Sequence, residues 1–258
     1  MLKFTKFHGA GNDFILIDDR EGTFLSHYCS QFIQHLCHRK FGIGADGLIL
    51  VQEAIDGADI QMRYFNSDGN EAQMCGNGIR CFGRFLLELG FSPQKTRVSI
   101  NRRIVELFYI DEKIGVAMGQ PQGMALSIST ERGVVHFINT GVPHIVHFID
   151  FSLKKAPLQE LGPFWRHYPL FAPQGANVNL AALDQGKVRI RTFERGVEGE
   201  TLACGTGACA VAAIAHALFG LSSPITIVCE GGEMEIQVGL EGLFMVGPAL
   251  RVFSGIFL

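Results

Sequence analysis

The sequence predicts an α+β protein made of two similar, duplicated domains, and an internal repeat carries this prediction. A Cys-Gly-x-Gly motif occurs at Met74–Gly78 (MCGNG) and again at Ala203–Gly207 (ACGTG), about half of the 258-residue chain apart. Each copy follows a strand-like run and precedes a helix-like run that a glycine ends. We expect each domain to be a strand barrel or sheet wrapped around a central helix, with the active site in the cleft between the domains.

The flanking elements repeat in the same order around both motifs. The first copy has strands at 60–65, 97–100 and 104–108 and a helix at 79–89, and the second has strands at 188–193, 225–228 and 234–238 and a helix at 208–218. The glycines that end the two helices are Gly90 and Gly220. The second helix is apolar almost all round, which is typical of a helix buried inside its own domain.

Proline and glycine near Gln120–Gly123 interrupt two strand patterns and indicate a domain boundary. We therefore expect an N-terminal domain over 1–120 and a C-terminal domain over 121–248. The last strand, 249–258, is a candidate to cross back to the first domain.

Composition and charge indicate an ordinary globular protein with a small-molecule partner. The 22 Lys and Arg residues nearly balance the 25 Asp and Glu residues, and 47% of residues are apolar, which excludes disorder, coiled coil and a nucleic-acid footprint. Seven cysteines without a CxxC spacing predict no metal site and thiols in a reducing cytoplasm. We expect no membrane and no nucleic acid as partners, and leave a homodimer open.

The repeated cysteines carry the chemistry. Each is placed at a strand-to-helix turn, where unpaired amides and the helix dipole favour an anion, either a bound carboxylate or the thiolate itself. A single Cys-Gly-x-Gly is more often a small buried residue, whereas two matched copies favour function. Two thiols on opposite sides of one carbon could remove a proton and return another, which inverts the stereocentre. The other five cysteines are expected to be packing residues.

Six further motifs surround the two cysteines in order along the chain. They are Phe7–Phe14 (FHGAGNDF), Gly42–Gly47 (GIGADG), Phe65–Gly69 (FNSDG), Gly141–His144 (GVPH), Asn177–Asn179 (NVN) and Phe193–Gly196 (FERG). With the cysteine motifs they resemble the diaminopimelate epimerase family. The resemblance implies a cofactor-independent amino-acid epimerase that interconverts LL- and meso-diaminopimelate, a precursor of lysine and peptidoglycan.

The same resemblance implies roles for individual residues. Cys75 and Cys204 would be the acid/base pair, and the amides of Gly76, Asn77, Gly205 and Thr206 would hold the reacting carboxylate. The other substrate-binding residues would be Asn12, Asn66, Asn177, Glu194 and Arg195, and His144 and Glu194 would tune the thiols. No cofactor, and in particular no pyridoxal phosphate, is then required, because the amides stabilise the charge that spreads into the carboxylate.

Two departures from the family pattern leave the substrate range open. Val142 stands where some members carry an asparagine, and the loop 196–200 is one residue longer than the common spacing. A racemase of glutamate or proline type is therefore an alternative. A phenazine-type isomerase lacks the cysteine pair, and an anion-binding module has no use for two symmetric thiols.

Overall fold

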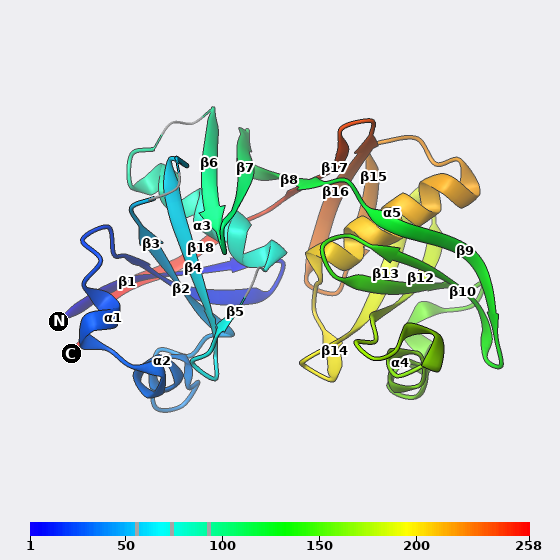
Figure 1. The fold of residues 1–258 in the computed structure, drawn as a ribbon, viewed down its shortest axis with the longest axis horizontal. Coiled ribbons are helices and arrows are strands. Elements are labelled where there is room, and N and C mark those ends of the chain that lie inside the picture. Colours follow the sequence, from blue (N-terminus) through cyan, green and yellow to red (C-terminus); the bar gives the residue numbers. More distant parts are fainter. Residues whose placement is uncertain (55–56, 73–74, 92–93) are drawn as a thin grey trace. The chain divides into compact units, whose positions relative to one another are not determined.

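The computed structural model describes residues 1–258 except 55–56, 73–74 and 92–93 (Figure 1). The chain folds into two compact units. Unit 1 contains residues 1–116 and 247–258, and unit 2 contains residues 117–246. The divisions thus fall after Val116 and Val246, whereas the sequence placed them after residues 120 and 248.

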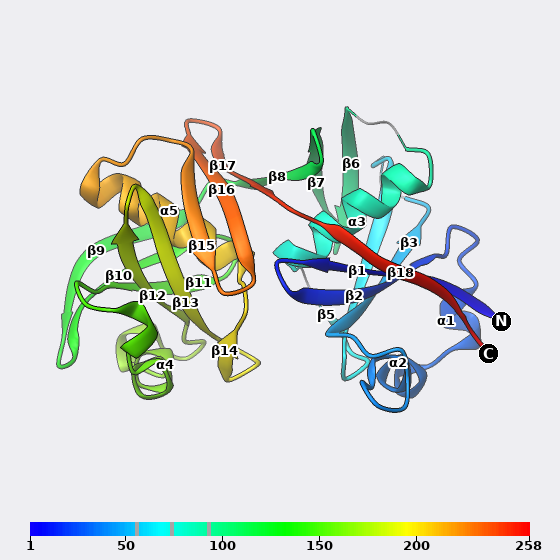
Figure 2. The same cartoon turned by 180° about the vertical axis from the view of Figure 1, so that it is seen from behind.

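Unit 1 is a strand-rich unit with three helices among its described residues. Its elements are β1 (Leu2–Gly9), β2 (Asn12–Asp18), α1 (Phe24–His27), α2 (Ser30–Cys37), β3 (Gly47–Gln52), β4 (Ile60–Asn66), β5 (Glu71–Ala72), α3 (Gly76–Glu88), β6 (Lys95–Ile100), β7 (Arg103–Ile110), β8 (Lys113–Gly119), which runs into unit 2, and β18 (Leu250–Phe257). β18 pairs antiparallel with β1, as seen in Figure 2.

Unit 2 has the same plan. Its elements are β9 (Gln122–Thr130), β10 (Gly133–Asn139), β11 (Pro143–Phe148), η1 (Leu153–Lys155), α4 (Leu158–Arg166), η2 (Pro169–Phe171), β12 (Asn177–Asp184), β13 (Lys187–Glu194), β14 (Gly199–Thr201), α5 (Gly205–Phe219), β15 (Ile225–Cys229), β16 (Gly232–Gly239) and β17 (Gly242–Gly247).

The strand pairings of the two units correspond one to one. β2 and β3 are parallel, as are β11 and β12, and the pairs β4–β6 and β13–β15 are parallel as well. The antiparallel pairs β1–β2, β3–β4 and β6–β7 match β10–β11, β12–β13 and β15–β16. β18 beside β1 corresponds to β9 beside β10. The predicted α+β class and the duplication of the fold are therefore confirmed.

The alternation of side chains along the strands builds two layers on each sheet. In unit 2, Ile145, Val178 and Leu180 pack with Trp165 of α4, whereas α5 covers the other face of the same strands (Figure 1). In unit 1, Ile15 and Leu48 pack likewise against α2, and α3 contacts β1 to β4. The alternate residues of the same strands face the central helix. In unit 2 these include His144 on β11 and Asn179 on β12.

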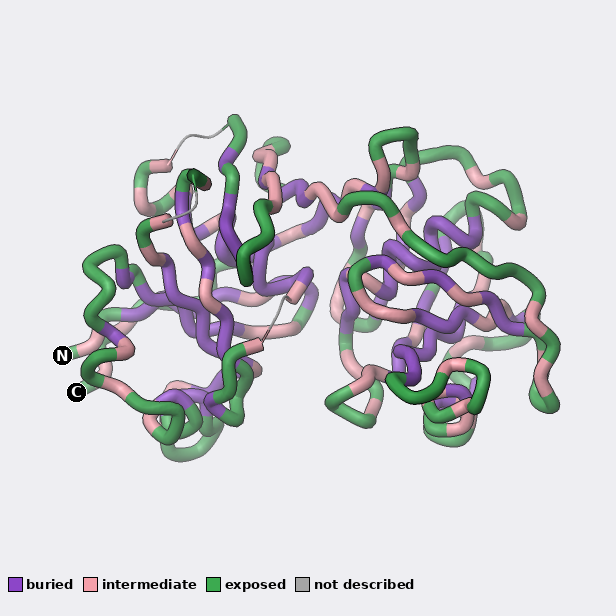
Figure 3. Tube along the Cα trace, viewed as in Figure 1, coloured by how far each residue is buried: buried purple, intermediate pink, exposed green. Residues whose placement is uncertain are grey.

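The central helices begin and end as the sequence predicts. Cys75 and Cys204 have extended backbone conformations and are the N-caps of α3 and α5. Gly220 ends α5 in the left-handed conformation, and Gly90 (φ 87°) follows α3 with hydrogen bonds from Gly90 N to Leu87 O and from Phe91 N to Leu86 O, a Schellman motif. All residues of α5 from Gly207 to Ala215 are buried, as Figure 3 shows.

Arg80 is a fully buried cation on α3. Its guanidinium donates to Gly76 O (3.0 Å), to Asn77 Oδ1 (2.9 Å) and to Pro248 O (3.4 Å). It therefore ties the first turn of α3 to the segment that leads into β18. A neutral side chain at this position would leave buried acceptors without a donor.

We expect Arg80→Met to lower the free energy of unfolding by about 2 to 4 kcal/mol, since methionine fills the space but cannot donate. Urea titration followed by circular dichroism measures this loss. Arg84→Met, a half-buried position on the same helix, is the matched control and should change stability by about 0.5 kcal/mol or less. Equal midpoints for both variants would show that the Arg80 contacts do not stabilise the fold.

Candidate active site

The first thiol, Cys75, lies at the start of α3 and is half-buried. Its Sγ accepts a hydrogen bond from Gly78 N at 3.4 Å and lies 3.4 Å from Asn12 Oδ1, to which the thiol can donate. Asn77 Nδ2 also donates to Asn12 Oδ1, at 3.4 Å. The structure thus brings Asn12, Cys75 and Asn77 together. Met74, the residue before Cys75 in the motif, lies outside the described residues.

The amide of Asn12 has a fixed orientation. Its Nδ2 donates to Asp46 Oδ2 at 2.6 Å, and because a carboxylate only accepts, Oδ1 must face Cys75. Asn66, the last residue of β4, is exposed and shares no hydrogen bond with this group among the described residues. Of the predicted side chains of unit 1, hydrogen bonds therefore join Asn12, Cys75 and Asn77 and do not include Asn66.

A carboxylate beneath this group is held by two cations. Asp13 pairs with Lys6 Nζ at 2.9 Å and with Arg39 at 2.8 Å, and Arg39 also reaches Asp46 at 2.6 Å. Burial raises the pKa of Asp13, but the hydrogen bonds and charges of Arg39 and Lys6 outweigh it and hold the pKa well below its usual range. Asp13 therefore stays charged and anchors the strand that carries Asn12.

The second thiol, Cys204, is buried with 5% of its surface exposed. Its Sγ lies 3.4 Å from Thr206 Oγ1, and Thr206 Oγ1 lies 2.9 Å from His144 Nε2. Thr140 Oγ1 donates to Thr206 O at 2.8 Å, which ties the first turn of α5 to the residue that follows β10. The predicted residues Cys204, Thr206 and His144 therefore form one hydrogen-bonded group.

His144 is fully buried, and burial together with the positive charge of Arg195 lowers its pKa to about 3. The imidazole is therefore neutral at neutral pH. A group with so low a pKa is a poor proton carrier, because it holds no proton on the second nitrogen in the working range. In this site His144 therefore acts as a neutral hydrogen-bond partner.

The far end of the unit 2 site is built on β12 and β13. Asn177 Oδ1 accepts from Arg195 N at 2.7 Å, and Asn177 Nδ2 lies 3.5 Å from His144 Nε2. Burial raises the pKa of Glu194, the last residue of β13. The loop that follows is tied down by an ion pair between Glu198 and Arg166 at 3.1 Å. Asn177, Glu194 and Arg195 thus lie on adjoining strand ends near His144.

Both helix starts present backbone amides in their first turns. The amides of Gly76 and Asn77 and those of Gly205 and Thr206 lie there, at the positive end of the helix dipole, a position that favours a bound anion. The glycines that follow permit a close approach: a Cβ at Gly207 would lie 2.5 Å from Asn179 Oδ1, and one at Gly78 would lie 3.1 Å from Ile49 Cδ1.

Sequence reasoning assigned no role to several residues that the structure places in these groups. Asp13, Asp46, Lys6 and Arg39 orient Asn12, and Asn179 and Thr192 lie behind His144. The available signal was the alternation Asn-x-Asn at 177–179, which puts both amides on one face of a buried strand.

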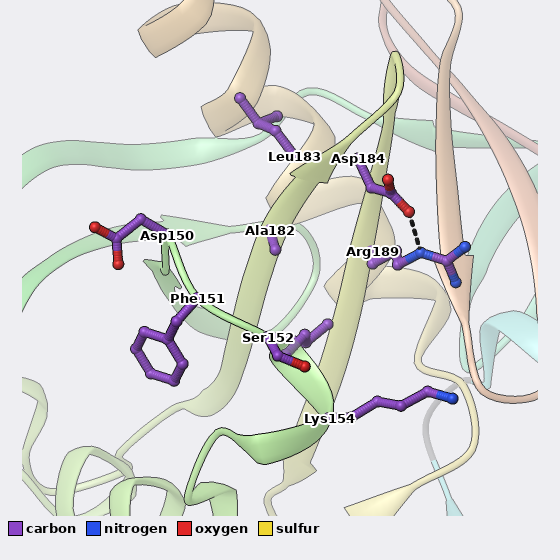
Figure 4. Close-up of a pocket in the computed structure, with 9 residues that line it drawn as sticks. Asp150, Phe151, Ser152, Lys154, Ala182, Leu183, Asp184 and Arg189 are labelled. Carbon is purple, nitrogen blue, oxygen red and sulfur yellow. Dashed lines mark hydrogen bonds and ion pairs between the residues drawn. The ribbon is translucent and has the colours of Figure 1, made fainter.

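Other features of the described residues do not add a second site. A surface hollow of about 450 Å³ is lined by residues 150–154, 182–184 and 189, and none of these is a predicted site residue (Figure 4). Within the described ranges no cluster of three or more His, Cys, Asp or Glu could bind a metal, and all seven cysteines are without a disulfide. In the same ranges, no helix has the length and apolar character that crossing a membrane requires.

Solved structures of similar fold come from several enzyme families. A phenazine biosynthesis protein of the PhzF family from Bacillus anthracis aligns with a TM-score of 0.77 at 15% identity, covering 99% of both chains. A probable proline racemase from Agrobacterium radiobacter aligns with a TM-score of 0.71 at 17% identity, covering 100% of this chain and 93% of that one. At such identities the likeness shows the fold alone.

Sequence relatives are closer. The family model described as diaminopimelate epimerase matches residues 4–124 and 136–252. A diaminopimelate epimerase from Archaeoglobus fulgidus is 42% identical, covering 99% of this chain and 96% of the relative, and one from Synechocystis is 39% identical, covering 98% of each. The chain therefore belongs to the diaminopimelate epimerase family of isomerases, as its motifs predict.

Proposed function

We propose that this chain interconverts LL- and meso-diaminopimelate without a cofactor, with Cys75 and Cys204 acting on opposite faces of one α-carbon. One observation carries the proposal: in a member of this family, the two thiols cap equivalent helices of a duplicated fold. One sulfur, as thiolate, takes the α-proton, and the other, as thiol, returns a proton to the opposite face. The resulting stereocentre is inverted, and the enzyme ends with its proton on the other sulfur.

The reacting carboxylate would bind the amides of Gly76, Asn77, Gly205 and Thr206. When the α-proton leaves, negative charge spreads into this carboxylate, and amides that are already oriented stabilise it without rearrangement. The dipoles of α3 and α5 would add to the same effect, because the positive end of a helix dipole stabilises an anion bound there. This accounts for proton abstraction from a weak carbon acid without pyridoxal phosphate.

The distal carboxylate and ammonium groups of the substrate would be bound by residues at the adjoining ends of β12 and β13. Arg195 can hold the distant carboxylate bidentately, and Glu194 can pair with the ammonium group. Asn177, whose amide is oriented by Arg195 N, and Asn12 and Asn66 would complete the contacts. These charged contacts favour diaminopimelate over proline, which has no distal charge.

The proposed partner is this small-molecule substrate, with a homodimer left open, and we place the enzyme in the cytoplasm. Val142 offers no side-chain amide to the distal end of the substrate, and the loop 196–200 is one residue longer than the common spacing. Both features are compatible with a wider substrate range. Assays of inversion with diaminopimelate isomers, glutamate and proline measure that range directly.

We expect Cys204→Ala and Cys75→Ala to separate proton exchange from inversion. Each variant keeps one thiol, which can remove the α-hydrogen from one stereoisomer and return solvent deuterium to the same face. Epimerisation should fall by several orders of magnitude, since acid-base groups supply about 10² to 10⁴ each. Mass spectrometry in deuterated water and chiral chromatography measure the two processes.

The two alanine variants should exchange opposite stereoisomers. Cys209→Ala, a buried cysteine of α5 outside the proposed site, is the control and should retain epimerisation. Exchange of the same isomer by both variants, or epimerisation near the parent rate in either, would refute the assignment of the thiols to opposite faces.

Arg195→Lys tests the distal contact. Lysine keeps the charge but loses the planar fork, so we expect kcat/KM for diaminopimelate to fall by the equivalent of about 1 to 3 kcal/mol. Arg189→Lys makes the same change on an exposed ion pair of β13 and should leave kcat/KM unchanged. If kcat/KM is equal in the two variants, Arg195 does not contact the substrate.

A further inference from the structure

The two units differ at the positions that support their thiols. The strand registers make Phe14, Ile49 and Tyr64 the equivalents of His144, Asn179 and Thr192. In unit 1, Phe14 and Tyr64 pack edge to face, with ring centroids 5.9 Å apart. In unit 2 the same positions hold a buried chain of polar side chains. At equivalent positions of the duplicated fold, apolar side chains therefore lie behind Cys75, and hydrogen-bonded polar side chains lie behind Cys204.

The amide of Asn179 has only one orientation that satisfies its neighbours. It is fully buried, its Oδ1 accepts from Thr192 Oγ1 at 3.0 Å, and its Nδ2 donates to the carbonyl of Ile145 at 3.0 Å. A backbone carbonyl can only accept, so the nitrogen of the amide must lie on that side. The same Nδ2 lies 3.2 Å from His144 Nδ1.

This orientation determines the tautomer of His144. An NH₂ group directed at Nδ1 requires a lone pair there, so the single proton of the neutral imidazole is on Nε2. Nε2–H then donates to Thr206 Oγ1 at 2.9 Å. Asn177 Nδ2, at 3.5 Å from Nε2, is too distant to compete with Thr206. The hydroxyl oxygen of Thr206 is thereby occupied as an acceptor.

The hydroxyl proton of Thr206 is then directed at Cys204 Sγ, 3.4 Å away. A donated O–H favours the thiolate of Cys204. Cys75 also accepts a hydrogen bond, from Gly78 N at 3.4 Å, but it faces Asn12 Oδ1 as well, an acceptor that needs the proton of the thiol. The charged residues beside this chain of hydrogen bonds are Arg195, which acts on His144, and Glu194, which precedes Arg195 on β13.

We propose that Asn179 is a positioning residue that fixes His144 as its Nε2–H tautomer, so that the Thr206 hydroxyl donates to Cys204 and this sulfur is the thiolate of the resting enzyme. The inference rests on the proposed two-thiol function, which needs one thiolate and one thiol at the start of each turnover. Asn179 contacts neither the substrate nor the reacting atoms in this scheme.

The tautomer is measured directly by ¹⁵N–¹H correlation spectra of the substrate-free enzyme labelled on histidine. We expect His144 to show a protonated Nε2 and an unprotonated Nδ1 between pH 5 and 8. In Asn179→Leu, a neutral replacement of similar volume, the signals should move toward a mixture of tautomers. A parent enzyme with the proton on Nδ1 would overturn the proposal.

The ionisation of Cys204 is measured by thiolate absorbance at 240 nm, taken as the difference between each protein and its Cys204→Ala counterpart. Thr206→Val keeps the backbone amide and the side-chain volume but removes the hydroxyl. We expect its Cys204 midpoint to rise by about one pH unit, the effect of losing one hydrogen bond to a charged group. Thr206→Ser should restore the parent midpoint.

Controls separate this effect from loss of packing. Ile227→Val shortens a buried side chain of β15 and should leave the Cys204 midpoint unchanged, and the Cys75 midpoint should stay constant in all variants. An unchanged Cys204 midpoint in Thr206→Val refutes the proposal even if Asn179→Leu fails to fold. Because these titrations use no substrate, a parent enzyme that titrates as expected but does not epimerise diaminopimelate would refute the proposed function instead.

Discussion

The site depends on one local arrangement, a cysteine at the N-terminus of a buried helix, beside the backbone amides of the first turn. Because α3 and α5 are surrounded by strands of their own units, their N-termini can only be satisfied by the cap, by nearby side chains or by a ligand. Cys75 Sγ accepts from Gly78 N, and the helix dipole favours an anion beside the other amides of this turn. The close approach of Asn179 leaves no room for a Cβ at Gly207, and Ile49 leaves little room for one at Gly78.

The rest of each unit orients polar groups around that helix start. Asp13, which stays charged beside Lys6 and Arg39, anchors the start of β2. Asp46 orients the amide of Asn12, the neighbouring residue on the same strand. Arg80 fixes the first turn of α3 to the approach of β18. Buried charges of this kind persist only when each is paired or hydrogen-bonded, which these are. As a result, Asn12 presents its acceptor oxygen, Oδ1, to the thiol of Cys75.

Much of this could be predicted from the sequence, because repetition and periodicity are local signals. The Cys-Gly-x-Gly repeat predicted the two central helices and their caps, and the apolar character of α5 predicted its burial. The hydrogen bonds of Asn179 and Asp46 could not be predicted, because they join residues far apart in sequence whose approach depends on strand register. The exposure of Asn66 likewise depends on how the turn after β4 folds.

Duplication makes the difference between the units informative. A repeated fold needs similar packing under both helices, and Phe14, Ile49 and Tyr64 show that apolar residues fulfil that need in unit 1. The polar chain in unit 2 lowers stability in acid, because His144 is buried with its pKa lowered to about 3. In the unfolded chain the imidazole binds a proton near pH 6.5, so between these values the unfolded state holds more protons and stability falls as the pH decreases. This loss is confined to one of two equivalent positions. In the proposed two-thiol mechanism the polar chain serves Cys204 alone, because the two sulfurs would begin each turnover in different protonation states.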